Sequence, residues 1–224
     1  NFGMFIGSYD NMRKLALRIR EAALELNVKR IIFGECGHAW RVAYSFLNTL
    51  AGPFDFLDSR YPVPQHICEL TYDLMNRNVL KFDKSANDDM TLTYHDSCNV
   101  ARASNMGDIL GGQFSVPRDI IKATVNNFYD MEEESIKEKT YCCGGGGGLL
   151  TDDLIELRMK GALPRMEALK RVVDDHGVTH MAAICAICKS QFSKAFQYYG
   201  FELDQIISLH QLVGNALIMN KKEL

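Results

Sequence analysis

The stretch Tyr141-Cys142-Cys143-Gly144-Gly145-Gly146-Gly147-Gly148 sets two adjacent thiols before five consecutive glycines. Adjacent cysteines seldom bond to each other, because that disulfide would be strained. A glycine run is costly to order, since glycine loses more backbone freedom on folding than any other residue. An anionic metal–thiolate or metal–sulfide centre would offset this cost, because glycine lets backbone N–H groups approach negative charge closely. Gly144, Gly145 and Gly146 are therefore candidate cofactor-binding residues.

The seven cysteines of the chain favour metal or redox chemistry. Their number is odd, and they include one vicinal pair and one Cys-x-x-Cys. This pattern fits a secreted disulfide framework poorly and suits a reducing compartment. The cysteines are Cys36, Cys68, Cys98, Cys142, Cys143, Cys185 and Cys188.

Length and composition set the outer bounds. The chain has 224 residues, 47% of them hydrophobic and 24% charged, with a formal net charge of -3. This is enough for one large domain or two small ones with a real core. The slightly acidic balance argues against a broad nucleic-acid surface. The sequence shows no apolar run long enough to span a bilayer and no signal peptide. Since residue 1 is Asn, we expect a piece of a longer polypeptide or a processed chain.

Hydrophobic spacing predicts helices that alternate with short buried strands. Helices are expected over 11–26, from the turn at 34–38 to about 50, over 64–78, from 117, from 151 to 177 with a bend or break near Gly161 and Pro164, from 188 to about 199, and over 209–219. Strands are expected over 30–33, 54–57, 91–95, 125–131, 180–184 and 204–207.

The order of these elements repeats. Helix, strand, cysteine-bearing turn, helix, strand and helix occur over 11–78 and again over 151–219, and a shift of 152 places Cys36 on Cys188. The sequence predicts an α/β fold of two tandem, pseudo-repeated α/β halves, with mainly parallel sheets covered by helices. The polar segment 81–89 is the expected linker. Residues 1–86 would form a degenerate, N-terminally incomplete first half, and residues 87–224 a complete cluster-binding half.

Five thiols of the second half follow strand ends or precede the glycine run, so we expect them to converge. Thiolates suit iron–sulfur clusters, zinc and copper(I). A tetrahedral zinc needs four ligands, so a fifth thiolate favours a polynuclear centre. The five are Cys98, Cys142, Cys143, Cys185 and Cys188. His95, three residues before Cys98, is the candidate catalytic proton source or hydrogen-bond donor to the centre, and His38 is a second.

Other chemistry-bearing residues have simpler expected roles. Cys36 stays open between a site residue and a structural thiol, whereas Cys68 shares a helix face with apolar residues and is expected in the core. Trp40 and Tyr44 are expected to pack rather than to bind a cofactor. The remaining histidines are expected to be structural or exposed; they are His66, His176, His180 and His210.

Three motifs together resemble the CCG domain of heterodisulfide-reductase-type iron–sulfur proteins. They are His95-Asp96-Ser97-Cys98, Cys142-Cys143-Gly144 through Gly148, and Glu35-Cys36-Gly37-His38-Ala39, with the Cys-x-x-Cys at 185–188. The resemblance covers the whole chain as two tandem domains. Within the family it is nearest to the DsrK type, the catalytic iron–sulfur subunits of membrane-associated Dsr electron-transfer complexes.

The resemblance implies a noncubane [4Fe-4S] cluster held by the same five cysteines. It implies a subunit of an oxidoreductase complex that cleaves, or in reverse forms, a disulfide or trisulfide. The substrate would be the two-cysteine C-terminal arm of a small sulfur carrier of the DsrC type. The protein would lie in the cytoplasm, peripheral at the inner face of the membrane through partner subunits, with no nucleic acid and no membrane insertion of its own.

The sequence also departs from the family. Ser97 stands where the family often has Pro, and Asn99 where it often has His. The first half keeps only Cys36 of a Cys-x-x-Cys, so one cluster is expected. Electron-relay clusters would lie on a missing N-terminal segment or on a partner subunit.

Three alternatives remain open from the sequence. A structural zinc domain would use four of the five cysteines and have no redox role. A thiol–disulfide oxidoreductase would work through Cys185 and Cys188 without a metal. A related subunit of a lactate- or glycolate-oxidising complex would share the cluster but not the substrate.

Overall fold

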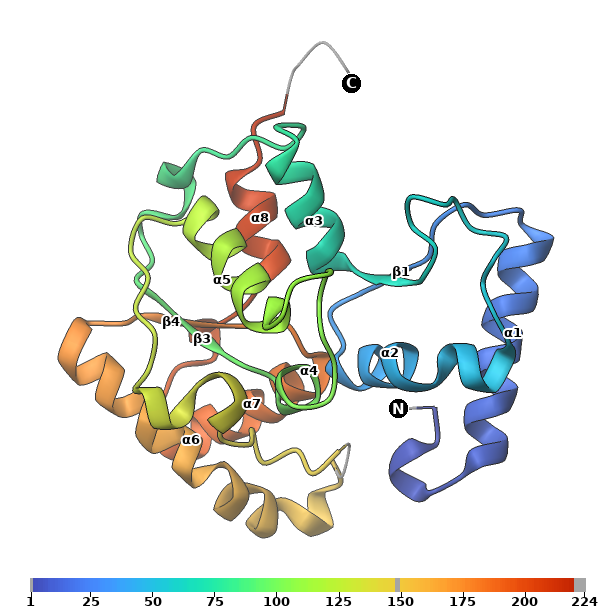
Figure 1. The fold of residues 1–224 in the computed structure, drawn as a ribbon. Coiled ribbons are helices and arrows are strands. Elements are labelled where there is room, and N and C mark those ends of the chain that lie inside the picture. Colours follow the sequence, from blue (N-terminus) through green and yellow to red (C-terminus); the bar gives the residue numbers. More distant parts are fainter. Residues whose placement is uncertain (1, 148–149, 220–224) are drawn as a thin grey trace.

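The computed structural model describes residues 2–147 and 150–219 (Figure 1). Gly148 and Leu149, where the glycine run is expected to pass into a helix, lie outside the described residues. The helices are α1 (Tyr9–Glu25), α2 (Gly37–Ala51), α3 (Ile67–Asn76), α4 (Cys98–Ala101), α5 (Gly112–Thr124), α6 (Ile155–His176), α7 (Ala186–Tyr199) and α8 (Leu209–Ala216). The strands are β1 (Ile32–Phe33), β2 (Gln65–His66), β3 (Leu92–His95), β4 (His180–Ala183) and β5 (Ile206–Ser208).

The strands form two parallel sheets, which confirms the predicted α/β fold class. β1 pairs with β2, and β3, β4 and β5 follow one another in a three-stranded sheet. In the larger sheet Leu92 lies opposite His180 and Met181 opposite Ile206. Parallel strands need crossover connections, and here helices supply them. The carboxyl ends of β3 and β4 therefore share one edge, from which residues 96–98 and 184–188 leave.

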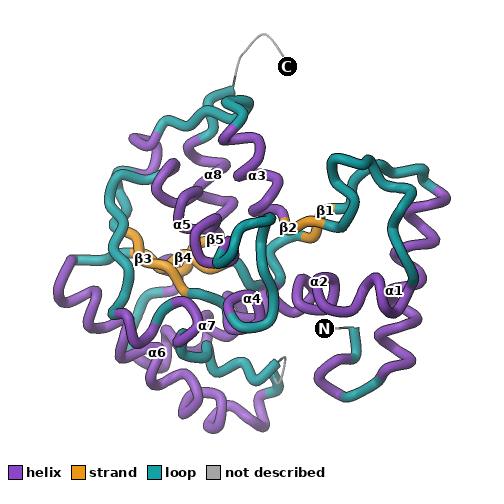
Figure 2. Tube along the Cα trace, viewed as in Figure 1, coloured by secondary structure: helices purple, strands orange, loops and turns teal. Residues whose placement is uncertain are grey.

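Helices cover both faces of the larger sheet (Figures 1 and 2). α5 and α8 lie on one side and α6 and α7 on the other. α3 lies beside α5, although it precedes the expected linker, and α1 and α2 project to the side. No described helix has both the length and the apolar character that crossing a membrane would need.

Two hydrophobic cores flank the larger sheet. One joins residues from α1, α2, α3, α5 and α8 with β3, so it includes residues on both sides of position 86. The other lies between α6, α7 and β4, and Cys143, Cys185 and Cys188 are part of it. Segments 1–86 and 87–224 thus share a core. The second core places the cysteines in apolar surroundings that exclude water.

The internal repeat has a clearer form in the structure than in the sequence. β1-α2-β2-α3 and β4-α7-β5-α8 are both parallel strand pairs, each with a crossover helix and a following helix. Cys36 is the N-cap of α2 and Cys185 the N-cap of α7. The structural repeat therefore aligns Cys36 with Cys185, and the sequence alignment of Cys36 with Cys188 is wrong.

Two predicted strands are absent from the described residues. Phe54 and Leu57 are buried, but they close a turn in which the Leu57 N–H donates to the Phe54 carbonyl at 3.1 Å. The partner of β1 is instead Gln65–His66, a pair too short and polar to be recognised from its pattern. Over 125–131 only Phe128 makes a bridge, to Leu92. The apolar residues of 54–57 and 125–131 reflect burial, and a buried segment need not pair as a strand.

Several helix boundaries also differ from the prediction. α3 begins at Ile67 rather than at Pro64, because His66 caps it through its ring nitrogen and Glu69 closes the capping box. α5 begins at Gly112, before Pro117. A 3-10 turn (Asp152–Leu154) separates Thr151 from α6, and Thr151 makes no side-chain cap.

The helix is not broken near Gly161 and Pro164, because α6 runs continuously to His176. Its buried face packs along the second core and holds the helix together through Pro164. Gly161 faces the glycine loop, since a Cβ there would lie in ordinary contact, 3.5 Å, with the Gly144 Cα. Gly177 ends the helix in the left-handed conformation, as expected.

Candidate metal centre

The five expected thiols come together at the carboxyl edge of the larger sheet, and Cys36 joins them. All seven cysteines are free thiols. Hydrogen bonds between thiols link these side chains in a series that begins at Cys36 and Cys185 and ends at Cys98. In order, the six members of this thiol network are Cys36, Cys185, Cys188, Cys143, Cys142 and Cys98. Cys68 is fully buried elsewhere in the first core, as expected.

The glycine loop supplies amide donors to the vicinal pair. The N–H of Gly144 donates to Cys142 Sγ at 3.3 Å, and that of Gly145 to Cys143 Sγ at 3.4 Å. The neighbouring thiols of Cys143 and Cys98, together with the N–H groups of Gly144 and Gly146, lower the pKa of Cys142. The three glycines thus stabilise negative charge on sulfur, which is the role that their sequence position suggests.

Helix α7 brings the Cys-x-x-Cys to the same place. Cys185 caps the helix and Cys188 lies one turn along, so the positive helix end is directed at both sulfurs. The thiols of Cys188 and Cys36, and the N–H groups of Cys188 and Gly37, lower the pKa of Cys185. A Cβ at Gly145 would lie 3.3 Å from Ile187 Cγ2, so the glycine loop lies against this turn.

Cys98 begins the short helix α4, directly after the end of β3. Asn99 Nδ2 lies 3.7 Å from Cys98 Sγ and can donate to it, and Asn99 Oδ1 accepts from Arg41 Nη1 at 3.1 Å. Ser97 Oγ lies 3.9 Å from Cys188 Sγ. The two positions at which the sequence departs from the family pattern, Ser97 and Asn99, therefore both contact sulfur.

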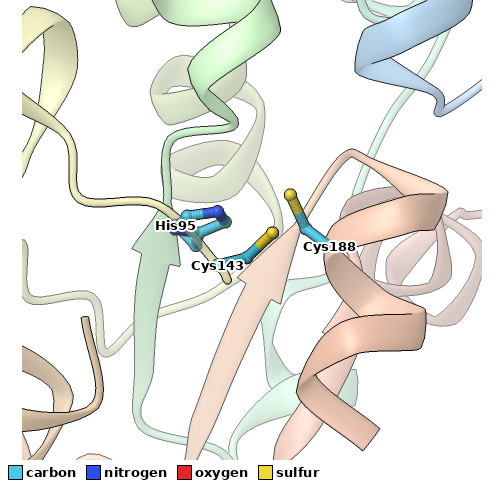
Figure 3. A group of neighbouring side chains, drawn as sticks. All are labelled: His95, Cys143 and Cys188. Carbon is cyan, nitrogen blue, oxygen red and sulfur yellow. The ribbon is translucent and has the colours of Figure 1, made fainter. Parts of the chain in front are cut away.

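His95 lies among the sulfurs at the end of β3 (Figure 3). One ring nitrogen of His95 and the sulfurs of Cys143 and Cys188 all lie within 4.8 Å of one another. The side chain is 0% exposed, and neither ring nitrogen has a hydrogen-bond partner among the described residues. Burial lowers the pKa of His95 to about 3, so the ring is neutral at neutral pH. A buried imidazole with no partner is a group that a bound ligand would satisfy.

His38 lies at the rim of the centre on α2. It is buried, and burial lowers its pKa. Its ring meets the ring of Phe5 edge to face, with centroids 4.9 Å apart. A Cβ at Gly147 would lie 2.9 Å from the same Phe5 ring, so Phe5 packs between α2 and the glycine loop.

Arginine side chains hold the irregular segment that leads into the vicinal cysteines. Arg102 donates to the carbonyl oxygens of Glu138 and Thr140, and Arg165 donates to the Thr140 hydroxyl at 3.0 Å. Arg158 donates to Gln191 Oε1 on α7 at 2.9 Å. The bonds of Arg102 and Arg165 add to the short 3-10 helices at 133–135 and 137–139, so side chains as well as the local backbone fix this segment.

A buried ion pair anchors the turn before Cys98. Arg118 holds Asp96 through two bonds, from Nη1 to Oδ1 at 2.9 Å and from Nη2 to Oδ2 at 2.7 Å. Asp96 Oδ2 also accepts the Lys137 N–H at 2.8 Å, which ties this turn to the segment before the glycine loop. Arg118 keeps a second partner in Asp130.

Replacing Asp96 with asparagine is expected to lower the free energy of unfolding by about 3 kcal/mol, because it leaves a buried guanidinium without its main counter-charge. The side chains of Arg118 and Asp96 are only 6% and 1% exposed. Asp174→Asn is the matched control, since its pair with Lys170 is exposed and is expected to contribute less than about 0.5 kcal/mol. Urea unfolding of the two variants measures the difference. Equal losses would show that the buried pair contributes no more than a surface one.

The residues present fit a thiolate-bound metal centre. The five expected thiols and a neutral imidazole offer soft donor atoms, and amide N–H groups and helix ends supply compensating positive charge. His95 is the polar group left unsatisfied within it. Four sulfurs would be enough for zinc, so the larger number favours a cluster of several metal ions.

Sequence reasoning missed several residues that build this site. Gly37, Ser97 and Asn99 contact its sulfurs, while Asp96 and Arg158 hold its loops. The position of Gly37 directly after Cys36 was a usable signal, because a glycine beside a thiol at a strand end permits close backbone approach. Arg158 gave none, since its partner Gln191 lies 33 residues away on another helix.

Comparison with known proteins agrees with this geometry. Residues 92–193 match the family model of the cysteine-rich domain CCG. The chain is similar to the Hdr-like menaquinol oxidoreductase iron-sulfur subunit 2 of Archaeoglobus fulgidus, with 38% identity over 245 residues, covering 98% of this chain and 42% of the relative. It is equally similar to the Hdr-like menaquinol oxidoreductase iron-sulfur subunit of Archaeoglobus profundus, with 38% identity over 246 residues and the same coverage. The chain spans less than half the length of these curated relatives.

Proposed function

Because residues 92–193 form a cysteine-rich CCG domain and the chain is homologous to iron–sulfur subunits of Hdr-like menaquinol oxidoreductases, we propose that it carries the iron–sulfur centre of an electron-transfer oxidoreductase complex. The single observation that carries this proposal is the thiol network, in which a buried, unpartnered His95 lies beside Cys143 and Cys188. Such a group of sulfurs is far more than a folded domain of this size needs for packing.

The proposed cofactor is a noncubane [4Fe-4S] cluster. Cys98, Cys142, Cys143, Cys185 and Cys188 would hold it, and when bound it supplies single electrons for chemistry at sulfur. The amides of the glycine loop lie where they offset the negative charge of thiolates. The second hydrophobic core excludes water from the inner side of the site, which strengthens these interactions.

His95 is the proposed proton-handling residue. A neutral imidazole donates a hydrogen bond from one ring nitrogen, and its other nitrogen can accept a proton and pass that proton on to a sulfur within reach. Its position beside Cys143 and Cys188 gives it that reach (Figure 3). The reaction we propose is reduction of a disulfide, in which one S–S bond, two electrons and two protons give two thiols, or its reverse. A trisulfide would react in the same way at one of its S–S bonds.

The substrate, partners and location are further proposals that rest on the resemblance to the DsrK type. The substrate would be the two-cysteine arm of a DsrC-type sulfur carrier. Partner subunits of a membrane-associated complex would deliver the electrons and keep the protein peripheral at the cytoplasmic face. We also propose that residues 87–224 form the cluster-binding half and residues 1–86 a degenerate copy, consistent with the repeated strand–helix order.

Anaerobic purification of the full chain, with iron, sulfide and zinc analysis and electron paramagnetic resonance (EPR) of the oxidised protein, tests the proposal. We expect about four irons and four sulfides per chain. We also expect an EPR signal that responds to added substrate thiol. One zinc per chain without sulfide would favour the structural zinc domain instead. A metal-free protein that retains thiol–disulfide exchange after chelation would favour an oxidoreductase acting through Cys185 and Cys188 alone.

A further inference from the structure

The thiol network extends into the part of the chain that the sequence assigns to a degenerate half. Cys36 follows β1 and caps α2, and its side chain interacts with that of Cys185. The backbone N–H groups of His38 and Ala39 are directed at the Cys36 sulfur. Cys36 is therefore one of the six thiols and receives amide donors, as Cys142 does from the glycine loop.

Gly37 shows how closely α2 approaches the centre. Its N–H donates to the sulfur of Cys185. A Cβ at this position would lie 2.6 Å from Ser97 Oγ and 3.4 Å from Cys185 Sγ. The first distance is too short for a side chain to be accepted without movement. The N-terminus of α2 is thus inserted between the turn before Cys98 and the Cys-x-x-Cys.

Glu35 fixes this arrangement from the other side. Its carboxylate accepts from Lys189 Nζ and Ser208 Oγ, each at 2.5 Å, and from the His210 N–H at 2.8 Å. Its carbonyl oxygen accepts the Ala186 N–H at 3.0 Å. The residue before Cys36 is therefore bound to α7, β5 and α8 at once. Cys36 cannot move away from Cys185 unless these bonds break.

We propose that Cys36 is a sixth thiolate of the metal centre, contributed by residues 1–86. The inference rests on the proposed iron–sulfur function. Two geometric observations support it: a Cβ built on Gly37 would lie 3.4 Å from Cys185 Sγ, and the carbonyl of Glu35, directly before Cys36, accepts the N–H of Ala186, directly after Cys185. The first segment then completes the site, in addition to packing against the second.

Alkylation of the full chain under anaerobic conditions tests this directly. The protein is treated with iodoacetamide before and after loading with iron and sulfide, and each cysteine is quantified by mass spectrometry. We expect loading to reduce labelling of Cys36 at least tenfold, as for Cys98 and Cys142. Cys68, which is buried away from the network, serves as the reference whose labelling does not respond to loading. Equal labelling of Cys36 in both forms would overturn the inference.

A variant distinguishes binding of the metal by Cys36 from simple shielding of its thiol by the loaded centre. Cys36→Ala removes one negative ligand, so the reduction potential of the loaded protein is expected to shift to a more positive value and its EPR spectrum to change, whereas Cys68→Ala leaves both as in the wild type. Cys36→Ser replaces it if the alanine variant does not fold. Unchanged potential and spectrum would overturn the inference while leaving the proposed function intact. A wild-type chain that incorporates no iron would overturn both.

Discussion

Replacing Cys143 with serine is expected to abolish incorporation of the iron–sulfur cluster. Cys143 is buried between Cys142 and Cys188 in the thiol network, and its sulfur lies within 4.8 Å of a Cys188 and a His95 ligand atom. A hydroxyl is a far poorer ligand for iron and sulfide clusters than a thiolate. The wild type should take up about four irons per chain on anaerobic reconstitution, and the variant close to none.

Cys68→Ala provides the matched control for this experiment. Cys68 is as deeply buried as Cys143 but packs in the first core on α3. Its loss should lower stability through packing alone and leave the iron content unchanged. Circular dichroism establishes that both variants are folded before metal analysis. If Cys143→Ser retained as much iron as Cys68→Ala, the vicinal pair would not hold the cluster. Zinc bound by Cys143→Ser would not count as retention of the cluster, because the remaining thiols are enough to bind one zinc ion.

The sequence predicted which cysteines lie close together better than it predicted the framework that brings them there. The cysteines of the site could be recognised from residue types alone, because a vicinal pair, a glycine run and a Cys-x-x-Cys each imply a local conformation. The strands that deliver Cys98 and Cys185 were predicted as short segments that end directly before a cysteine-bearing turn. Their convergence then follows from the parallel order of the sheet.

The parts that were missed depend on contacts between distant segments. β2 consists of Gln65 and His66, which carry no strand pattern and pair with β1 only because α2 crosses between them. The contact between Cys36 and Cys185 depends on how the two repeated units face each other. Single-sequence patterns contain the elements of such an arrangement but not its relative orientation. For the same reason the pattern assigned Cys36 to a degenerate half, although its thiol meets those of the other.

Gly144→Ala is expected to disrupt the site without removing any sulfur. Gly144 has a φ of 86°, which costs a residue with a side chain about 1–2 kcal/mol. A Cβ there would lie 2.3 Å from the Arg158 carbonyl oxygen and 2.9 Å from the Ala162 nitrogen, both in the backbone of α6. A helix backbone cannot yield by that amount, so the loop must move and carry Cys142 and Cys143 with it. We expect a loss of at least about 3 kcal/mol in unfolding free energy and an iron content far below that of the wild type.

Gly200→Ala isolates the conformational part of this effect. Gly200 ends α7 with a φ of 81°, but no atom lies within 4 Å of a Cβ built on it. The same backbone strain without the clash should cost about 1–2 kcal/mol and leave iron incorporation intact. Urea unfolding and metal analysis of the two variants therefore separate strain from displacement. Equal stability and iron content in both would mean that the glycine loop can shift from α6 while its sulfurs stay in place. In that case the close packing of Gly144 on α6 would not be what positions the vicinal cysteines, and the amide donors of the loop would have to hold them unaided.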